Sequence, residues 1–435
     1  MYALDITAPD NPIFMWKISA ETTPAKVCVA NGACTNAAQF NELGQTWSTP
    51  VVGKVRANSN PVLIFGGGYD AGNPVVNTAP YAGEDAMPPG TRSMGRAVFV
   101  VDAVTANIVQ SWGVGQSGPF LGSSASSMIY AIPSDVTALN TDLDAQNYID
   151  RLYVGDVGGN VWRFDTDNSD VTQWKGKLLA SLSNATGEKR KFLFAPAYVK
   201  QNTPFRFDAV YIGSGDREHP LCLTANDPGP PPKTNSCSQF ATDDRMFMLI
   251  DTDVGLAATA GSPIVLTDLY TRLASDVTVG TSNTVLNSYK GWYKGLDNGE
   301  KVTNTVSVFA NRLRFGTYAP LGQSAGACVP LGEGRLNEID ALTGDLLPIN
   351  GTVTAPSDRY YSAFISHGYV SAGQTIVVGL AAALVATLIG TVLGALSGFF
   401  GGKVGDFLEW VYNVFTAMPN ILLILSFAEI GRAHV

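Results

Sequence analysis

Oxygen-bearing residues at regular spacing mark one short stretch of this sequence as a candidate cation site. Asp142, Asp144, Gln146 and Asp150 stand at relative positions 1, 3, 5 and 9, and Tyr148 stands at position 7. This spacing lets the four side chains and the Tyr148 carbonyl converge on one hard cation. Ca²⁺ takes about 6–8 oxygen ligands, so water or neighbouring loops must complete the shell. The stretch therefore predicts a Ca²⁺ site.

Two positions depart from the usual pattern of such loops. Gln146 supplies a neutral amide where a carboxylate is usual, which predicts a weaker affinity. Asn147 stands at position 6, where glycine usually makes the sharp turn, although asparagine tolerates the left-handed region better than most residues. The alternative interpretation is a solvated, aspartate-rich turn that binds no metal.

The elements that must position this loop follow it directly. Leu152 and Val154 alternate with Tyr153, which predicts a half-buried strand. Residues 155–160 carry turn chemistry, and residues 161–165 resume a strand. The loop is therefore expected to lead into a β-hairpin.

The same unit recurs along the chain: a hydrophobic strand, a glycine-rich turn and a strand that ends in aspartate. The unit spans residues 62–102 and recurs at residues 151–165, 209–251 and 313–340. Two of the units close alike, with Asp-Ala-Val-Thr-Ala from Asp102 and Asp-Ala-Leu-Thr-Gly from Asp340. Repeats of short strands at this spacing predict an all-β fold, a partial or modified quinoprotein-like β-propeller of about five blades.

Composition agrees with this fold class and excludes one class of partner. Charged residues make up 15% of the 435 residues, beside 45 glycines and 24 prolines, which suits strands and turns better than helices. The net charge is −9, and basic patches are absent from the sequence. A nucleic-acid partner is therefore not expected.

Cysteine usage indicates the compartment. Cys28 and Cys34 bracket one short loop, and Cys222 and Cys237 bracket another, so two disulfides and an oxidising compartment are predicted. The alternative is free thiols in a reducing compartment, and Cys328 has no evident partner. No signal peptide opens the sequence, so an exported protein is expected to have a further N-terminal part.

Three runs, residues 2–18, 45–55 and 134–165, together resemble the C-terminal propeller of the PilC/PilY family. These are tip-associated adhesins and biogenesis factors of type IV pili. The resemblance covers about residues 2–350, and the family's aspartate loop falls on Asp142, Asp144, Gln146 and Asp150. It implies an exported, calcium-binding protein of the periplasm or outer surface, without enzymatic activity. The implied partners are the type IV pilus with its minor pilins and a host or abiotic surface, and the implied roles are pilus assembly, retraction control and attachment.

An enzyme is the competing interpretation. The tryptophans and the Asp-Ala-x-Thr-Gly pattern are also similar to quinone-dependent dehydrogenase propellers, which predicts a polar funnel holding a quinone and calcium. The sequence contains no zinc-type Cys/His cluster, no Gly-x-Ser-x-Gly elbow and no phosphate loop. The charged run from Asp216 to His219 is expected to be a solvated turn, so no catalytic residue is predicted.

The C-terminal part changes character. Residues 375–396 carry no charge over 22 positions, long enough as a helix for the roughly 30 Å hydrocarbon core of a bilayer. Residues 407–427 form a second apolar segment, and the two predict a separate hydrophobic helical hairpin. Residues 372–428 resemble an inner-membrane permease of peptide ABC transporters. We predict a propeller (1–351), a junction (352–371), a transmembrane segment (372–428) and an adapter-derived tail (429–435), joined as a chimera; the alternative is a membrane-anchored transport component.

Overall fold

The computed structural model describes residues 1–347 and strand Tyr360–Ser366. Gaps fall at residues 21–23, 31, 33, 71–93, 123, 184–189, 203–204, 221–241, 255–257, 274–285, 321–331 and 348–359. The chain divides into two compact units, Met1–Ser371 and Ala372–Val435. The second unit, which contains the predicted transmembrane segment and tail, lies outside the described residues.

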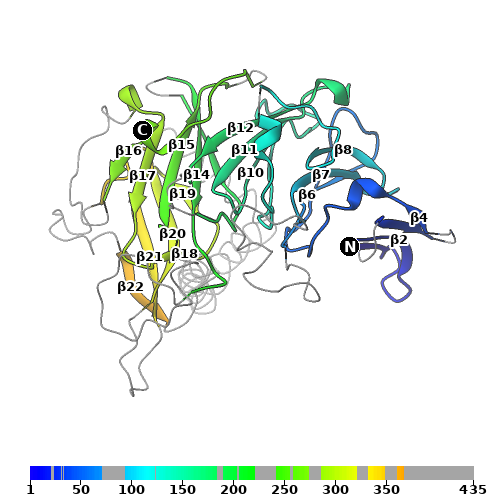
Figure 1. The fold of residues 1–435 in the computed structure, drawn as a ribbon, viewed down its shortest axis with the longest axis horizontal. Helices are drawn as coiled ribbons and strands as arrows, with labels where there is room; N and C mark the ends of the chain where they lie inside the picture. Colours follow the sequence, from blue (N-terminus) through cyan, green and yellow to red (C-terminus); the bar gives the residue numbers. More distant parts are fainter. Residues whose placement is uncertain are drawn as a thin grey trace, which may run out of the picture. The chain divides into compact units, whose positions relative to one another are not determined.

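The described strands form five sheets, here called blades 1 to 5, which follow the order of the chain (Figure 1). Blade 1 contains β1 (Tyr2–Asp5), β2 (Ile13–Ser19), β3 (Lys26–Val29) and β4 (Thr35–Asn36). Blade 2 contains β5 (Val51–Gly53), β6 (Val62–Gly66), β7 (Ala97–Asp102) and β8 (Ile108–Gly113). Blade 3 contains β9 (Thr137–Leu139), β10 (Arg151–Gly155), β11 (Asn160–Asp165) and β12 (Lys175–Ser181).

Blade 4 contains β13 (Ala197–Gln201), β14 (Phe207–Gly213), β15 (Arg245–Asp251), β17 (Gly291–Gly295) and β16 (Tyr270–Arg272) in that spatial order. Blade 5 contains β18 (Lys301–Val302), β20 (Arg312–Pro320), β21 (Gly332–Asp340) and β22 (Tyr360–Ser366), with β19 (Ser307–Phe309) paired to β20. Short 3₁₀ turns lie at η1 (Ala38–Phe40), η2 (Ser124–Ser127), η3 (Val171–Gln173) and η4 (Leu266–Asp268).

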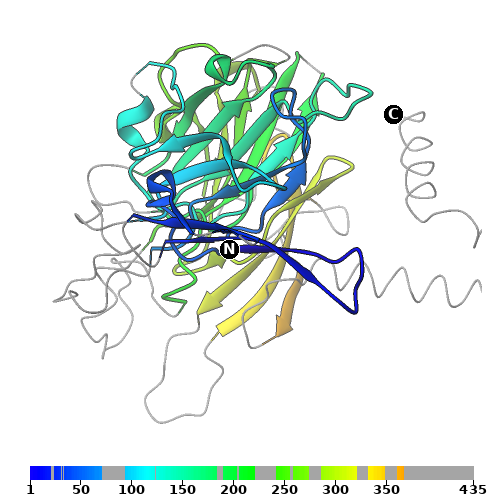
Figure 2. The same ribbon diagram turned by 90° about the vertical axis from the view of Figure 1, so that its right-hand side faces the viewer.

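Sequential antiparallel pairing dominates the blades, as the β1–β2 hairpin in dark blue illustrates (Figure 2). Parallel pairing of β16 with β17 is an exception in blade 4. In blade 3 the predicted hairpin is present, with Arg151 opposite Asp165 and Val154 opposite Trp162. Asp156 shapes its turn by accepting hydrogen bonds from the backbone amides of Gly158 (2.8 Å) and Asn160 (3.0 Å).

The repeated aspartate pattern makes the same turn in blades 2 and 5. Asp102 Oδ1 accepts hydrogen bonds from the amides of Val104 and Thr105, and Asp340 Oδ1 accepts them from the corresponding Leu342 and Thr343. The fifth residue of each pattern has a positive φ, at Ala106 (63°) and Gly344 (68°). This aspartate turn accounts for the pattern by local backbone chemistry.

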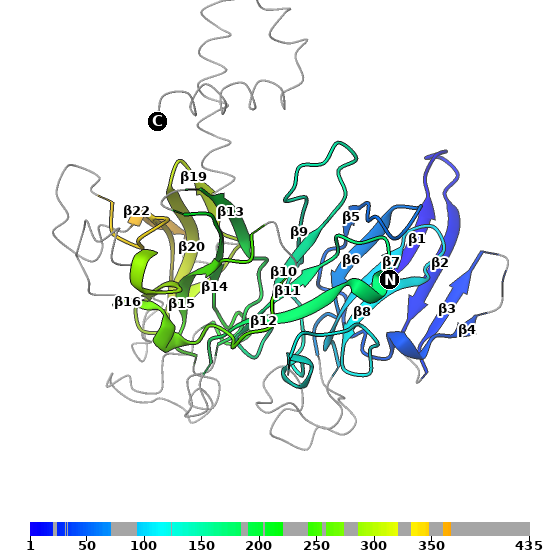
Figure 3. The same cartoon turned by 90° about the horizontal axis from the view of Figure 1, so that it is seen from above.

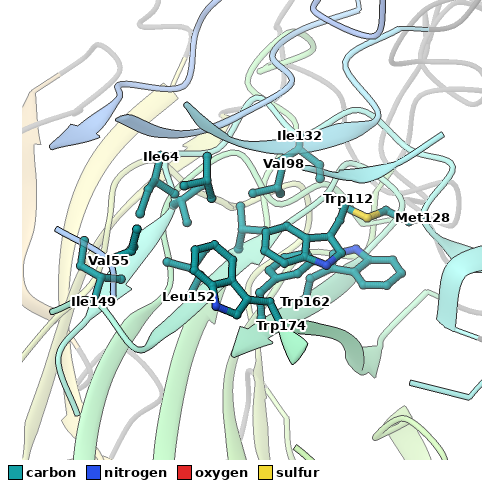
Figure 4. Close-up of a cluster of buried hydrophobic side chains, with 14 of the residues drawn as sticks. Val55, Ile64, Val98, Trp112, Met128, Ile132, Ile149, Leu152, Trp162 and Trp174 are labelled. Atoms are coloured by element: carbon teal, nitrogen blue, oxygen red, sulfur yellow. The ribbon is translucent and has the colours of Figure 1, made fainter. Parts of the chain in front are cut away.

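Hydrophobic cores lie between consecutive blades. Among the described residues, four clusters join blades 1 and 2, 2 and 3, 3 and 4, and 4 and 5. The cluster between blades 2 and 3 holds the buried indoles Trp112, Trp162 and Trp174 (Figure 4). Blade 3 accordingly lies between blades 2 and 4 (Figure 3). Face-to-face packing of successive antiparallel sheets is the architecture of a β-propeller.

Strand β10 corrects the sequence-based prediction of a half-buried strand, because all five of its residues are buried. Leu152 and Val154 enter the core shared with blade 2, whereas Tyr153 enters the core shared with blade 4. The alternation is real, but both faces meet another blade. Tyr153 suits such a face because its hydroxyl donates to Asp251 of blade 4 at 2.8 Å.

Within the described part of the chain, no helix combines the length and the apolar character that crossing a membrane requires. Residues 375–396 and 407–427 lie outside that part.

Candidate metal centre

The predicted metal-binding stretch, Asp142–Asp150, lies in the metal loop, the connection formed by residues 140–150 between β9 and β10, and so leads into a strand as expected. Leu143 (φ 55°) and Asn147 (φ 56°) both adopt the left-handed conformation. Asn147 is the residue at which the sequence predicts a sharp turn without glycine. Asparagine populates this region more readily than other non-glycine residues, so the tight turn forms despite the substitution.

Asp150 is the most deeply buried of the predicted ligands, with 5% of its surface exposed. Its Oδ2 accepts hydrogen bonds from the Thr141 amide (2.7 Å), the Thr141 hydroxyl (3.0 Å) and the Asp142 amide (3.1 Å). Its Oδ1 is buried and has no hydrogen-bond partner. Burial raises the pKa of this carboxyl, and the hydrogen bonds from Thr141 and Asp142 oppose that rise. A buried carboxylate oxygen without a partner is the kind of acceptor that a bound cation satisfies.

The carboxylates of Asp142 and Asp144 lie against a cation from the preceding blade. Arg56 Nη2 is 2.7 Å from Asp144 Oδ2 and 3.4 Å from Asp142 Oδ2. The other oxygens face the loop backbone, since Asp142 Oδ1 accepts from the Asp144 amide (3.1 Å) and Asp144 Oδ1 from the Tyr148 amide (2.9 Å). The two side chains therefore order the loop and share one guanidinium.

The remaining predicted ligands occupy the outer part of the loop. Gln146 is exposed, and Tyr148 is partly buried beneath Arg56, whose guanidinium carbon lies 5.0 Å from the ring centroid. The backbone of Tyr148 forms a parallel bridge with Lys54, and the Ile149 amide donates to the Lys54 carbonyl at 2.8 Å. The loop is thus attached to blade 2 through the segment that carries Arg56.

These donors fit a hard cation by their chemistry. Asp142, Asp144, Asp150 and Gln146 offer side-chain oxygens, Tyr148 offers a carbonyl, and Asp150 Oδ1 is a buried acceptor still without a partner. Among the residues that the structure describes, no group of three or more His, Cys, Asp and Glu side chains is placed to hold a metal. In this arrangement Arg56 and backbone amides hold the carboxylates of Asp142 and Asp144.

Sequence reasoning missed Arg56 and its third carboxylate partner, Asp167, whose Oδ1 lies 2.6 Å from Arg56 Nε. Arg56 precedes Asp144 by 88 residues and belongs to another blade. The only indication of this contact in the sequence was the repeat architecture, because repeats bring loops of consecutive blades together. The alignment of neighbouring blades decides which residues of their loops are in contact. A single sequence does not reveal that alignment.

Two other predictions concern the disulfides and the turn from Asp216 to His219. A disulfide joins Cys28 and Cys34 beside the β3–β4 hairpin, whereas Cys222, Cys237 and Cys328 lie outside the described residues. The turn from Asp216 to His219 is solvated only in part: Arg217 is exposed, and Glu218 and His219 are partly buried, but Asp216 is fully buried. It is buried because Lys191 and His219 bind its carboxylate and replace water.

Among the described residues, five sheets of mainly antiparallel strands, with cores between consecutive sheets, define the class as a β-propeller-like protein. No protein-family model matches the chain. The chain is similar to the "Type IV pilus biogenesis factor PilY1 homolog" of Xylella fastidiosa, with 23% identity over 374 residues. That alignment covers 79% of this chain and 21% of the relative, so the chain spans about a fifth of that protein.

The fold is also similar to the crystal structure of the Pseudomonas aeruginosa PilY1 C-terminal domain. The TM-score is 0.51 at 17% sequence identity, over 85% of this chain and 70% of that domain. The sequence and structure comparisons thus point to the same PilY1-like proteins.

Proposed function

We propose that this chain is the calcium-binding propeller of a type IV pilus biogenesis and tip adhesin protein. The observation that carries the proposal is the sequence similarity to a protein named as a type IV pilus biogenesis factor, over 79% of this chain. The likeness in fold to the PilY1 C-terminal domain supports it. The proposed roles are pilus assembly, retraction control and surface attachment.

The proposed partners are the type IV pilus, with its minor pilins, and a host or abiotic surface. The propeller would act after export, in the periplasm or on the outer surface at the pilus tip. The disulfide between Cys28 and Cys34 supports this location, because such bonds persist in oxidising compartments.

Calcium would bind at the loop formed by residues 140–150. Asp142, Asp144 and Asp150 would supply charged oxygens, and Gln146 and Tyr148 neutral ones. A bound ion would neutralise the carboxylates and stabilise the loop between its attachments. Those attachments are the hydrogen bonds to Lys54 of blade 2 and from Lys200 Nζ of blade 4 to the Thr141 carbonyl (2.9 Å).

A genetic experiment tests both parts of this proposal. In a piliated bacterium that carries the complete gene, deletion of the gene should reduce surface piliation and twitching several-fold. Asp150→Asn should reproduce much of that loss, because it removes the charge of the buried ligand. Asp10→Asn removes the same charge from an exposed turn in blade 1 and serves as the matched control. Normal piliation after deletion would contradict the pilus function, and normal piliation in Asp150→Asn alone would contradict the role of calcium.

We further propose that residues from about 352 onward, including the permease-like segment at 372–428, do not take part in the function of the propeller. The proposal rests on the change of composition in the sequence. Long-read sequencing of the source DNA across codons 351–373 tests it. A continuous natural gene would favour the alternative of a membrane-anchored component.

A further inference from the structure

One guanidinium, that of Arg56, meets three carboxylates at the metal loop. Arg56 Nη2 lies 2.7 Å from Asp144 Oδ2 and 3.4 Å from Asp142 Oδ2, and Nε lies 2.6 Å from Asp167 Oδ1. The guanidinium also covers the ring of Tyr148. Arg56 therefore contacts three of the five residues whose spacing predicts the metal site.

The backbone that leads into Arg56 is anchored at the two residues before it. Val55, its neighbour, is fully buried in the core between blades 2 and 3. Lys54 is hydrogen-bonded to the loop through the Ile149 amide (2.8 Å). The guanidinium can change rotamer, but the backbone beneath it stays beside the loop.

A metal ion and this guanidinium need the same oxygens. An oxygen that accepts a charge-assisted hydrogen bond from Arg56 offers less to an ion, and the two positive charges repel at close range. Asp150 Oδ1 is independent of this competition, because it is buried without a hydrogen-bond partner. The carboxylates that pair with Arg56 are those of Asp142, Asp144 and Asp167. Asp150 thus offers a cation an oxygen that Arg56 does not occupy.

We infer that Arg56 is a resident counter-cation, which holds Asp142 and Asp144 in the metal-free loop and competes with calcium for them. It thereby lowers the affinity of the loop for calcium. When calcium binds, Arg56 releases these two oxygens and keeps Asp167, which lies outside the predicted ligand set. This inference rests on the proposed calcium site and adds the residue that regulates it.

Calorimetric titration of the purified full chain with CaCl2 tests the competition. Arg56→Gln should bind calcium about tenfold more tightly than the wild type, because a positive charge is removed from the site. Arg312→Gln is the matched control: it removes the same charge from an ion pair with Glu338 in blade 5 and should leave calcium affinity unchanged. Equal or weaker calcium binding by Arg56→Gln overturns the inference.

Hydrogen exchange supplies a readout that does not depend on bound calcium. In EGTA, amides of residues 141–150 should exchange faster in Arg56→Gln than in the wild type, and calcium should restore their protection. Unchanged exchange in EGTA overturns the role of Arg56 in the metal-free loop. If the wild type binds calcium and Arg56→Gln binds it equally, only the competition fails. If neither protein binds calcium, the proposed calcium site fails, and the competition fails with it.

Discussion

Arg163 Nη1, on β11 of blade 3, lies 2.7 Å from Asp251 Oδ2, at the end of β15 in blade 4, and both side chains are buried. Tyr153 donates to the same oxygen at 2.8 Å, and Arg163 Nε donates to Asp165 Oδ1 at 3.0 Å. Burial of a charge is tolerated when it is paired and hydrogen-bonded, as here. The two bonds to Asp251 join blade 3 to blade 4.

Asp251→Asn should lower the free energy of unfolding by about 3–5 kcal/mol, because it leaves the buried Arg163 short of a counter-charge. Urea unfolding of the full chain measures this loss. The control is Asp268→Asn, which breaks a partly exposed pair with Lys290 and should cost less than about 1 kcal/mol. A loss of similar size in the two variants would show that the pair between the blades contributes little.

This pair also shows what could be predicted from the sequence. The hairpin of blade 3, the loop before it and the linked Cys28 and Cys34 all involve residues close in sequence, and local spacing is enough to suggest them. Arg163 and Asp251 are 88 residues apart, and so are Arg56 and Asp144. Side-chain alternation along a strand predicts on which face of the sheet each side chain lies. It does not tell which side chain of the neighbouring blade it meets.

The burial of polar residues, like the contacts between blades, could not be predicted from the sequence. The sequence predicts that Asp216 is solvated, because its neighbours in the sequence are charged. In the structure its carboxylate lies 2.9 Å from His219 Nδ1 and 3.0 Å from Lys191 Nζ, and these partners replace water. Lys191 precedes it by 25 positions, too far for a local pattern to reveal the pair.

Asp216 should make the protein sensitive to acid. Burial alone would raise the pKa of Asp216, but the hydrogen bond with His219 and the charge of Lys191 outweigh it and lower the pKa from 3.8 to about 2. A pKa that is lower in the folded state gives stability above pH about 4, and that stability disappears as the pH falls toward 2. The loss through this group should be about 2 kcal/mol, since each pKa unit corresponds to about 1.4 kcal/mol.

The measurement compares unfolding free energies at pH 5 and pH 2.5 in the wild type and in Asp216→Asn. The variant should be less stable at pH 5 and should lose less between the two pH values, because it has no carboxyl to protonate. Asp10→Asn, at an exposed turn of blade 1, controls for a general effect of removing an acidic group. Equal acid sensitivity of wild type and Asp216→Asn would show that other groups set it.

The disulfide between Cys28 and Cys34 gives the last prediction. It closes a short loop, with a sequence separation of 6, between β3 and β4 at the edge of blade 1. In the chain-entropy model, closing so short a loop stabilises the folded state by about 2 kcal/mol. The double variant Cys28→Ser, Cys34→Ser should therefore unfold at lower urea than the wild type by that amount.

Dithiothreitol separates this bond from the predicted bond between Cys222 and Cys237. The reductant should destabilise the wild type by at least as much as the double substitution does. If Cys222 and Cys237 are also bonded, the double variant should still lose stability in dithiothreitol, and adding Cys222→Ser with Cys237→Ser should abolish that response. If dithiothreitol leaves the stability of the double variant unchanged, the second disulfide is contradicted. If dithiothreitol leaves the stability of the wild type unchanged, the Cys28–Cys34 bond does not contribute to stability.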